Sequence, residues 1–77
     1  HANLINANMR DANCHKANLQ GANLNSADLS KANLDEASIE NAEFTNADLD
    51  HARINRKWKK YFERLKVRNY ESIRWVN

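Results

Sequence analysis

The sequence predicts an all-β solenoid, a tube of stacked short strands that is closed at its C-terminal end by a helix. Three observations lead to this prediction. An alanine returns at every fifth position from Ala2 to Ala52, an apolar residue follows each alanine two positions later, and the pattern stops near Asn55, where the charge also changes sign. A period of five fits neither a simple strand nor a helix. Sustained over many units, it is typical of a repeat protein.

The repeat runs for eleven units without a break. Its alanines are Ala2, Ala7, Ala12, Ala17, Ala22, Ala27, Ala32, Ala37, Ala42, Ala47 and Ala52. The apolar residues that follow them are Leu4, Met9, Cys14, Leu19, Leu24, Leu29, Leu34, Ile39, Phe44, Leu49 and Ile54. Residues two apart on an extended segment point to the same side, so both columns face inward. Each unit is therefore a very short strand, followed by a polar corner.

The narrow interior and the corners make further demands on the residue types. Alanine recurs because a narrow tube has little room for a second large side chain, so leucine at Ala22 or Ala32 should destabilise by about 1–3 kcal/mol. Gly21, the only glycine, is expected to supply a corner with positive φ. The Asn and Asp residues between the two inward columns face outward, where they are expected to hydrogen-bond between coils.

The placement of charges indicates four sides per coil. Residues one coil apart stack, and like charges there are unfavourable. Spacings of 15 and 25 residues both pair fewer opposite charges, and more like charges, than a spacing of 20 does. At 20, one like pair, Asp28/Asp48, stands against the opposite pairs Asp11/Lys31, Lys16/Glu36 and Glu36/Arg56.

The run ANLQGANLNSADLSKANLDEASIENAEF resembles the pentapeptide-repeat family, whose consensus is A(D/N)LXX. The resemblance covers residues 2–54 and implies a right-handed quadrilateral β-helix of nearly three coils over residues 1–55. It also implies that Phe44 occupies a central inward site stacked over Leu24 and Leu4. The departures from the consensus are Ser38, Glu43 and Arg53 in place of Asn or Asp, and Met9 and Cys14 in place of Leu.

The tail, residues 56–77, breaks the period and predicts a basic amphipathic helical cap. Asn69 would cap or interrupt a helix that starts near Arg56, so that NYESIRWV forms either a continuation or a second short helix. The apolar residues that return on one helical face are Trp58, Tyr61, Phe62, Leu65, Ile73 and Val76. This stripe is expected to cover the open end of the tube. The opposite end, at Ala2 and Leu4, has no such cover, which favours missing repeats or an end-to-end homodimer.

The net charge of +2 hides an uneven distribution. Residues 1–55 hold eight acidic residues and four Lys or Arg, whereas residues 56–77 hold eight Lys or Arg and two Glu. A basic segment with interleaved aromatic residues is compatible with phosphate or membrane contact. The aromatic residues are needed for docking on the tube, however, so neither nucleic acid nor a membrane is the expected partner.

The sequence predicts no catalytic, cofactor-binding or metal-binding residue, and no cofactor or small-molecule substrate. A catalytic site needs a nucleophile or base with an orienting partner, or converging metal ligands. His15 is expected on a corner over Asp35, and His51 over Lys31, both as solvated residues. Cys14 faces inward, where it behaves as a small hydrophobe.

The expected function is that of a non-enzymatic structural or protein–protein interaction module, a fragment of a larger pentapeptide-repeat protein with a partner of unknown identity. The alternative implied by the resemblance is a DNA mimic that binds DNA gyrase or another topoisomerase. The Asp28/Asp48 pair favours this alternative, and the short length and basic tail disfavour it. A single cysteine, with neither a signal peptide nor a membrane-spanning run visible, indicates a cytoplasmic location.

Overall fold

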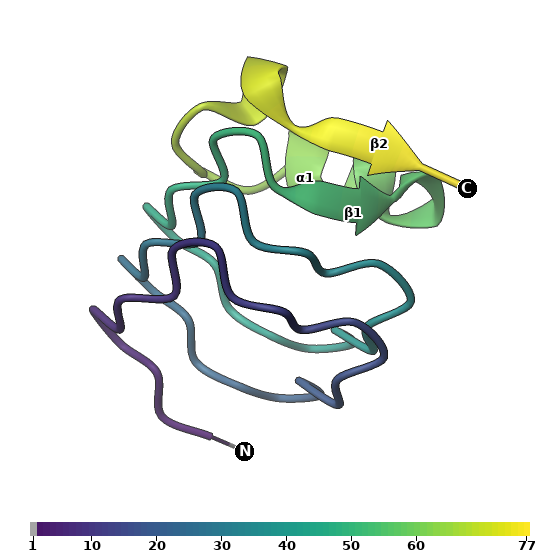
Figure 1. The fold of residues 1–77 in the computed structure, drawn as a ribbon. Helices are drawn as coiled ribbons and strands as arrows, with labels where there is room; N and C mark the ends of the chain where they lie inside the picture. The colour runs from purple at the N-terminus through teal and green to yellow at the C-terminus, as the bar shows by residue number, and fades with distance from the viewer. Residues whose placement is uncertain (1) are drawn as a thin grey trace.

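The computed structural model describes residues 2–77 and contains few regular elements. These are strand β1 (Arg53–Asn55), the 3-10 helix η1 (Arg56–Trp58), helix α1 (Lys59–Glu63), the 3-10 helix η2 (Tyr70–Ser72) and strand β2 (Arg74–Val76). Before residue 53 the chain forms isolated parallel bridges between segments that lie one above another (Figure 1). The N-terminal segment lies at one end of this stack and the tail covers the other.

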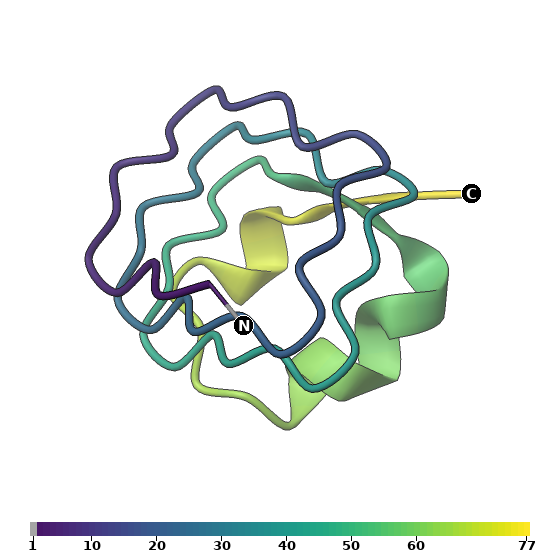
Figure 2. The same ribbon diagram turned by 90° about the horizontal axis from the view of Figure 1, so that it is seen from below.

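The segments that lie one above another are twenty residues apart. The bridges pair Asn3 with Asn23, Asn8 with Asp28, Asn13 with Asn33, Asn18 with Ser38, Asn23 with Glu43, Asp28 with Asp48, Asn33 with Arg53 and Asp48 with Arg68. We call each circuit of twenty residues a winding: 2–21, 22–41 and 42–61. The first two hold four pentapeptides each and the third holds three, and Figure 2, which looks along the stack, shows the successive outlines superimposed. The spacing predicted from the charges is thus the spacing of the bridges.

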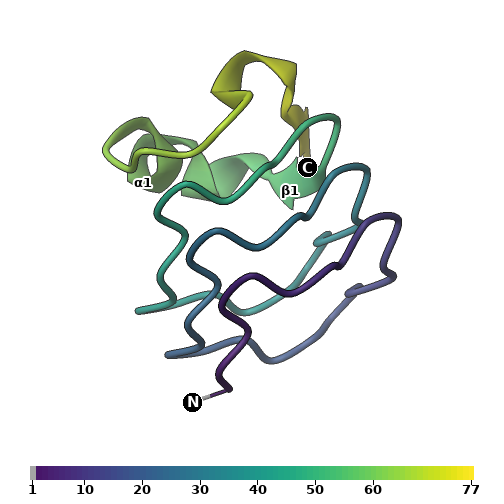
Figure 3. The same cartoon turned by 90° about the vertical axis from the view of Figure 1, so that its left-hand side faces the viewer.

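Backbone hydrogen bonds join the first winding to the second on four sides and the second to the third on three. The pattern alternates, as where the Leu4 N–H donates to the Asn23 carbonyl at 2.7 Å and the Asn23 N–H donates to the Ala2 carbonyl at 2.9 Å. A side view shows the windings running in parallel at a regular separation (Figure 3). These bonds satisfy the main-chain groups of segments too short to count as strands.

Every pentapeptide except the last, which runs into η1, ends in a tight turn that has a residue of positive φ. In the first, the Ala7 N–H donates to the Leu4 carbonyl at 3.0 Å, and Asn6 has φ 60°. Equivalent residues every five positions, through His51, have φ between 58° and 68°. Gly21 has φ 68°, as the sequence predicted. At the other nine positions a Cβ disfavours this conformation by about 1–2 kcal/mol, so the bonds between windings must maintain it.

The Asn and Asp residues between the inward columns do not act as predicted. Their side chains hydrogen-bond mainly within their own pentapeptide, where Asn8 Oδ1, for example, accepts from the Arg10 N–H at 3.2 Å. The same bond forms at Asn3, Asn13, Asn18, Asn23, Asp28, Asn33 and Asp48. A short side chain bonds its own backbone two residues on more easily than it reaches the next winding. The carboxamide therefore builds the corner.

Glu43 shows what happens when the short side chain is absent. Without an Asn or Asp at this position, the Thr45 N–H donates instead to Asn25 Oδ1 of the preceding winding, at 2.9 Å. Asn25 Nδ2 in turn donates to Glu43 Oε1 at 3.3 Å. Here a side-chain hydrogen bond between windings substitutes for the local one, but it comes from the corner residue Asn25 and not from the column between the inward residues.

The core is the pair of inward columns in the second and third windings. Leu4, Leu24 and Phe44 occupy equivalent places in consecutive windings, as the resemblance implied, and both Leu24 and Phe44 have no exposed surface. In the first winding Leu4, Met9 and Cys14 are only partly buried. The buried apolar residues are Leu19, Ala22, Leu24, Ala27, Leu29, Ala32, Leu34, Ala37, Ile39, Ala42, Phe44, Ala47, Leu49, Ala52, Ile54, Phe62 and Ile73.

The tail differs from the predicted helix. Helical structure beginning at Arg56 ends at Glu63, so the helix does not continue. The second short helix is the 3-10 helix η2, which starts after Asn69, and residues 74–76 then form β2, which pairs in parallel with β1. The Arg74 N–H donates to the Ala52 carbonyl at 2.8 Å, and the Arg68 N–H to the Ala47 carbonyl at 2.7 Å. The last winding would otherwise expose unpaired main-chain groups, and an extended tail pairs with them where a helix cannot.

Aromatic side chains of the tail cover the core at this end. Phe62 has no exposed surface, and its ring lies edge-on to Phe44 with centroids 5.0 Å apart. Trp75 lies 6.1 Å from Phe62, and the Tyr61 hydroxyl donates to the Ala42 carbonyl. Of the predicted stripe, Phe62 and Ile73 are buried, while Trp58, Tyr61 and Leu65 are half-buried against the core.

No helix within residues 2–77 is long and apolar enough to cross a membrane.

Candidate functional site

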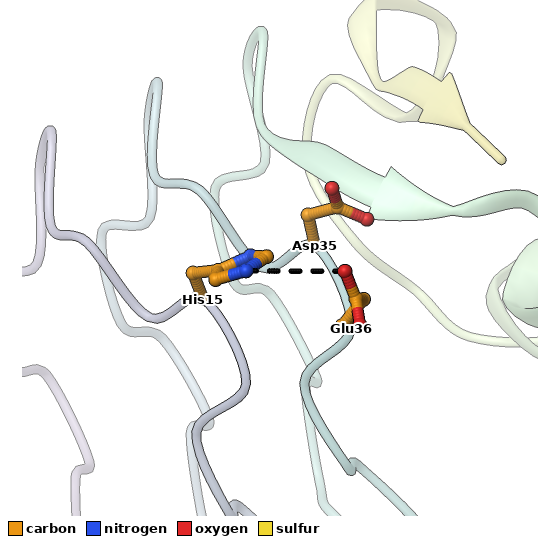
Figure 4. Close-up of side chains that lie close together, drawn as sticks. All are labelled: His15, Asp35 and Glu36. Carbon is orange, nitrogen blue, oxygen red and sulfur yellow. Dashed lines mark ion pairs between the residues drawn. The ribbon is translucent and has the colours of Figure 1, made fainter.

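Three titratable side chains meet on one corner of the outer surface (Figure 4). We call His15, Asp35 and Glu36 the His15 cluster. His15 comes from the first winding and the two carboxylates from the second, and one ligand atom from each residue lies within 4.8 Å of the others. His15 Nε2 is 3.8 Å from Glu36 Oε2. The ladder between windings therefore brings an imidazole and two carboxylates together.

The corner geometry positions each member of this cluster. The Asn13 side chain accepts from the His15 N–H at 3.1 Å, and the Asn33 side chain accepts from the Asp35 N–H at 2.9 Å. Glu36 occupies the positive-φ position of its turn, with φ 62°. The sequence placed His15 over Asp35 and paired Glu36 with Lys16. A strict offset of twenty residues cannot show the contact between His15 and Glu36, because these residues lie in neighbouring columns.

Asp35 is the least exposed member of the cluster. Its side chain is 18% exposed, and its Oδ2 atom lies 3.9 Å from Arg53 Nη2. Its Oδ1 atom is buried and accepts no hydrogen bond within residues 2–77. A buried polar atom without a partner calls for an explanation, since most such atoms are paired in native proteins.

His51 lies on a comparable corner but has a different environment. Its Nδ1 atom is 2.8 Å from Asp50 Oδ1, a neighbour in sequence, and its side chain is more than half exposed. The sequence placed it over Lys31, whereas the structure pairs it with one carboxylate of its own winding. Its surroundings match the predicted solvated corner residue.

The stacked carboxylates Asp28 and Asp48 each have compensating partners. Hydrogen bonds from the Ser30 hydroxyl and backbone N–H lower the pKa of Asp28, to which Arg10 also lies close, at 3.6 Å. Burial is the largest influence on Asp48 and opposes its ionisation, but the hydrogen bond from Asn69 at 2.7 Å and other favourable contacts lower its pKa overall. The column is thus flanked by groups that offset its negative charge.

The other surface features offer little chemistry. A depression of about 460 Å³ is lined by Asn18, Gln20, Gly21 and Asn41, which supply amide and backbone groups but no general acid or base. Burial raises the pKa of the Cys14 thiol, so the less nucleophilic protonated form is favoured. The arrangement that sequence reasoning missed is the complete His15 cluster, because no pattern in the sequence indicates that Glu36 lies near His15.

The basic residues in α1 and at its C-terminal end face solvent. Lys59, Lys60 and Arg64 are exposed, while Phe62 of the same helix is buried. The Lys57 ammonium lies 5.3 Å from the centroid of the Trp58 ring. The helix therefore uses its aromatic face against the core and presents only its charges outward.

Comparison with known proteins agrees with the repeat geometry. A family model described as pentapeptide repeats matches eight copies, over residues 1–25 and 22–56. Neither the curated proteins nor the solved structures contained a match to the chain. The family model covers well over half of the sequence, and the twenty-residue bridges join its units. The chain belongs to the pentapeptide-repeat family.

Proposed function

We propose that this protein is a non-enzymatic structural or protein–protein interaction module. In this proposal residues 1–55 form a right-handed quadrilateral β-helix of nearly three coils, and residues 56–77 form its C-terminal cap. The cap combines the short helix α1 with the paired strand β2. The observation that carries the proposal is the regular ladder of backbone bonds, which holds outward side chains in columns.

Such a surface is suited to recognition because it is ordered before it binds. Local side-chain bonds, such as that from the Gln20 N–H to Asn18 Oδ1 at 3.1 Å, fix the corners between the columns. A partner that docks on these faces orders little backbone, and pre-organisation of this kind improves affinity by lowering the entropic cost of binding. The partner proposed is a protein, and the location proposed is the cytoplasm.

The experiment that tests this proposal compares single-face variants in proximity labelling within cells. Glu40→Lys and Asp11→Lys each reverse one exposed charge, on different corners. We expect one of them to reduce labelling of a particular protein while the other leaves it unchanged, with both variants retaining wild-type circular dichroism. The interaction proposal is wrong if neither charge reversal changes which proteins are labelled and an unfolded variant labels the same proteins.

A second copy of the chain is the partner we propose for the N-terminal end. Ile5 is 47% exposed there, and Leu4 and Met9 are only partly buried. The Asn8 and Asn13 N–H groups make no hydrogen bond within residues 2–77, whereas the equivalent Asp28 N–H donates to the Ala7 carbonyl at 2.9 Å. End-to-end pairing would satisfy these groups. Light scattering should show a dimer that Ile5→Lys weakens, and a monomer at all concentrations would exclude it.

Binding to a topoisomerase as a DNA mimic has less support. A mimic needs an uncompensated negative face, and the cations Arg10 and Arg68 offset the charges of Asp28 and Asp48. The exposed Lys59 and Lys60 would instead favour direct contact with nucleic acid. Titration of DNA gyrase and of duplex DNA with this protein at physiological salt distinguishes the two. Inhibition of gyrase would favour the mimic, and salt-dependent DNA binding would favour the tail.

A further inference from the structure

We propose that the His15 cluster binds a divalent transition-metal ion, with Zn²⁺ as the reference ion. The proposal departs from the sequence prediction that the chain holds no metal ligand, and it does not depend on the function proposed above. His15, Asp35 and Glu36 supply one imidazole nitrogen and two carboxylate oxygens. This donor set is one that Zn²⁺ takes in proteins, with water at the remaining position.

The distances within the cluster allow coordination after small side-chain movements. The three ligand atoms lie within 4.8 Å of one another, and His15 Nε2 is 3.8 Å from Glu36 Oε2. Bonds of 2.0–2.2 Å in a tetrahedral zinc site place ligand atoms about 3.4 Å apart. The ligand atoms must therefore approach one another by up to about 1.4 Å. The side chains of His15 and Glu36 are 40% and 55% exposed, so rotation toward the ion meets little resistance.

A second observation comes from Asp35, which is the most buried ligand. Its Oδ1 atom accepts no hydrogen bond within the described part of the chain, although it is buried. Arg53 lies on the side of the other oxygen, Oδ2, at 3.9 Å. Asp35 thus has a buried oxygen without a hydrogen bond, and the same side chain offers a ligand atom to the cluster, so a cation bound by this carboxylate would satisfy it. The chain already holds Asp35 in position through the Asn33 side chain.

Binding would add a link between two windings that the backbone ladder and the His15–Glu36 pair already join at this corner. His15 belongs to the first winding, whose core residues are only partly buried, and the carboxylates belong to the well-buried second winding. A ligand that binds only the folded chain raises its stability by mass action. Zinc is therefore expected to raise the melting temperature of the protein.

The test is calorimetric titration of the full chain with ZnCl₂. We expect His15→Gln to abolish one binding event and Glu36→Gln to weaken it by at least about tenfold. His51→Gln is the matched control, because His51 lies on a similar corner with one adjacent carboxylate, Asp50. It should leave the affinity unchanged. Repeating each titration with His1→Gln removes an imidazole that lies outside the described residues.

A second readout separates a built site from loose attachment of zinc to surface histidines. The zinc-induced rise in melting temperature should disappear in His15→Gln and persist in His51→Gln. All variants must also show the wild-type circular dichroism spectrum without metal. If His15→Gln binds zinc as the wild type does, or if His51→Gln loses as much affinity as His15→Gln, the site does not exist.

Discussion

Replacement of Phe62 by alanine removes the ring that fills the C-terminal end of the core. Phe62 has no exposed surface, and three aromatic rings surround it, with centroid distances of 5.0 Å to Phe44, 5.4 Å to Tyr61 and 6.1 Å to Trp75. Truncation of a buried phenylalanine to alanine costs about 3–5 kcal/mol. Native proteins of this length are stable by about 4–12 kcal/mol in total. The variant should therefore lose a large share of its stability.

The assay is urea unfolding followed by circular dichroism and by tryptophan fluorescence. Phe62→Ala should lower the free energy of unfolding by about 3–5 kcal/mol and the melting temperature by at least about 12 °C. Phe62→Leu, which retains most of the apolar volume, should lose less and keep the comparison measurable if the alanine variant fails to fold. Lys60→Ala is the control on the same helix, because Lys60 is exposed, and should change stability by less than about 0.5 kcal/mol. A loss below about 1 kcal/mol for Phe62→Ala would refute the assignment of this ring to the core.

Three other predictions concern the windings. Ala27→Leu should lower the free energy of unfolding by about 1–3 kcal/mol, because Ala27 is buried. Ala7 lies one winding earlier and is only partly buried, so Ala7→Leu should lower it clearly less in the same urea titration. Equal losses of stability would contradict a narrow interior that opens at the N-terminal end. The lowered pKa of Asp28 contributes stability that is present above the ordinary carboxyl pKa of 3.8 and is lost as the pH falls through the lower folded value. Asp28→Asn should therefore flatten the decline in melting temperature below about pH 4. An unchanged decline would exclude this contribution. Because burial raises the pKa of Cys14, its reaction with a disulfide reagent at pH 8 should be slower in the native protein than in guanidinium chloride, whereas equal rates would show an accessible thiolate.

The columns of the repeat could be predicted because the local sequence pattern and the pairing register between windings place the same residues inward. An alanine every five residues, with an apolar residue two positions later, places both on one side of an extended segment whatever lies around it. The charge pairs then indicated the offset of twenty residues that the bridges have. Gly21 was predicted correctly for the same kind of reason, since the positive φ of a corner is a property of the local backbone.

The asparagine bonds and the tail could not be predicted in this way. An Asn side chain can accept a hydrogen bond either from the backbone N–H two residues on or from a group in the next winding. The geometry of the corner determines which of the two bonds forms. For the tail, the aromatic spacing indicates a helix, but β2 forms because the edge of β1 offers unpaired main-chain groups. A free edge is a property of the assembled windings, and local helix propensity carries no information about it.

For the candidate site, the sequence by itself determined that His15 lies one winding from Asp35, because that follows from the twenty-residue offset. Only the tertiary structure decided that Glu36 joins them, 3.8 Å from His15, and that Asp35 keeps a buried oxygen without a hydrogen bond within residues 2–77. The repeat determines which residues share a column. Contacts between columns depend on how side chains turn at each corner, and that orientation is set by the packing of neighbouring windings.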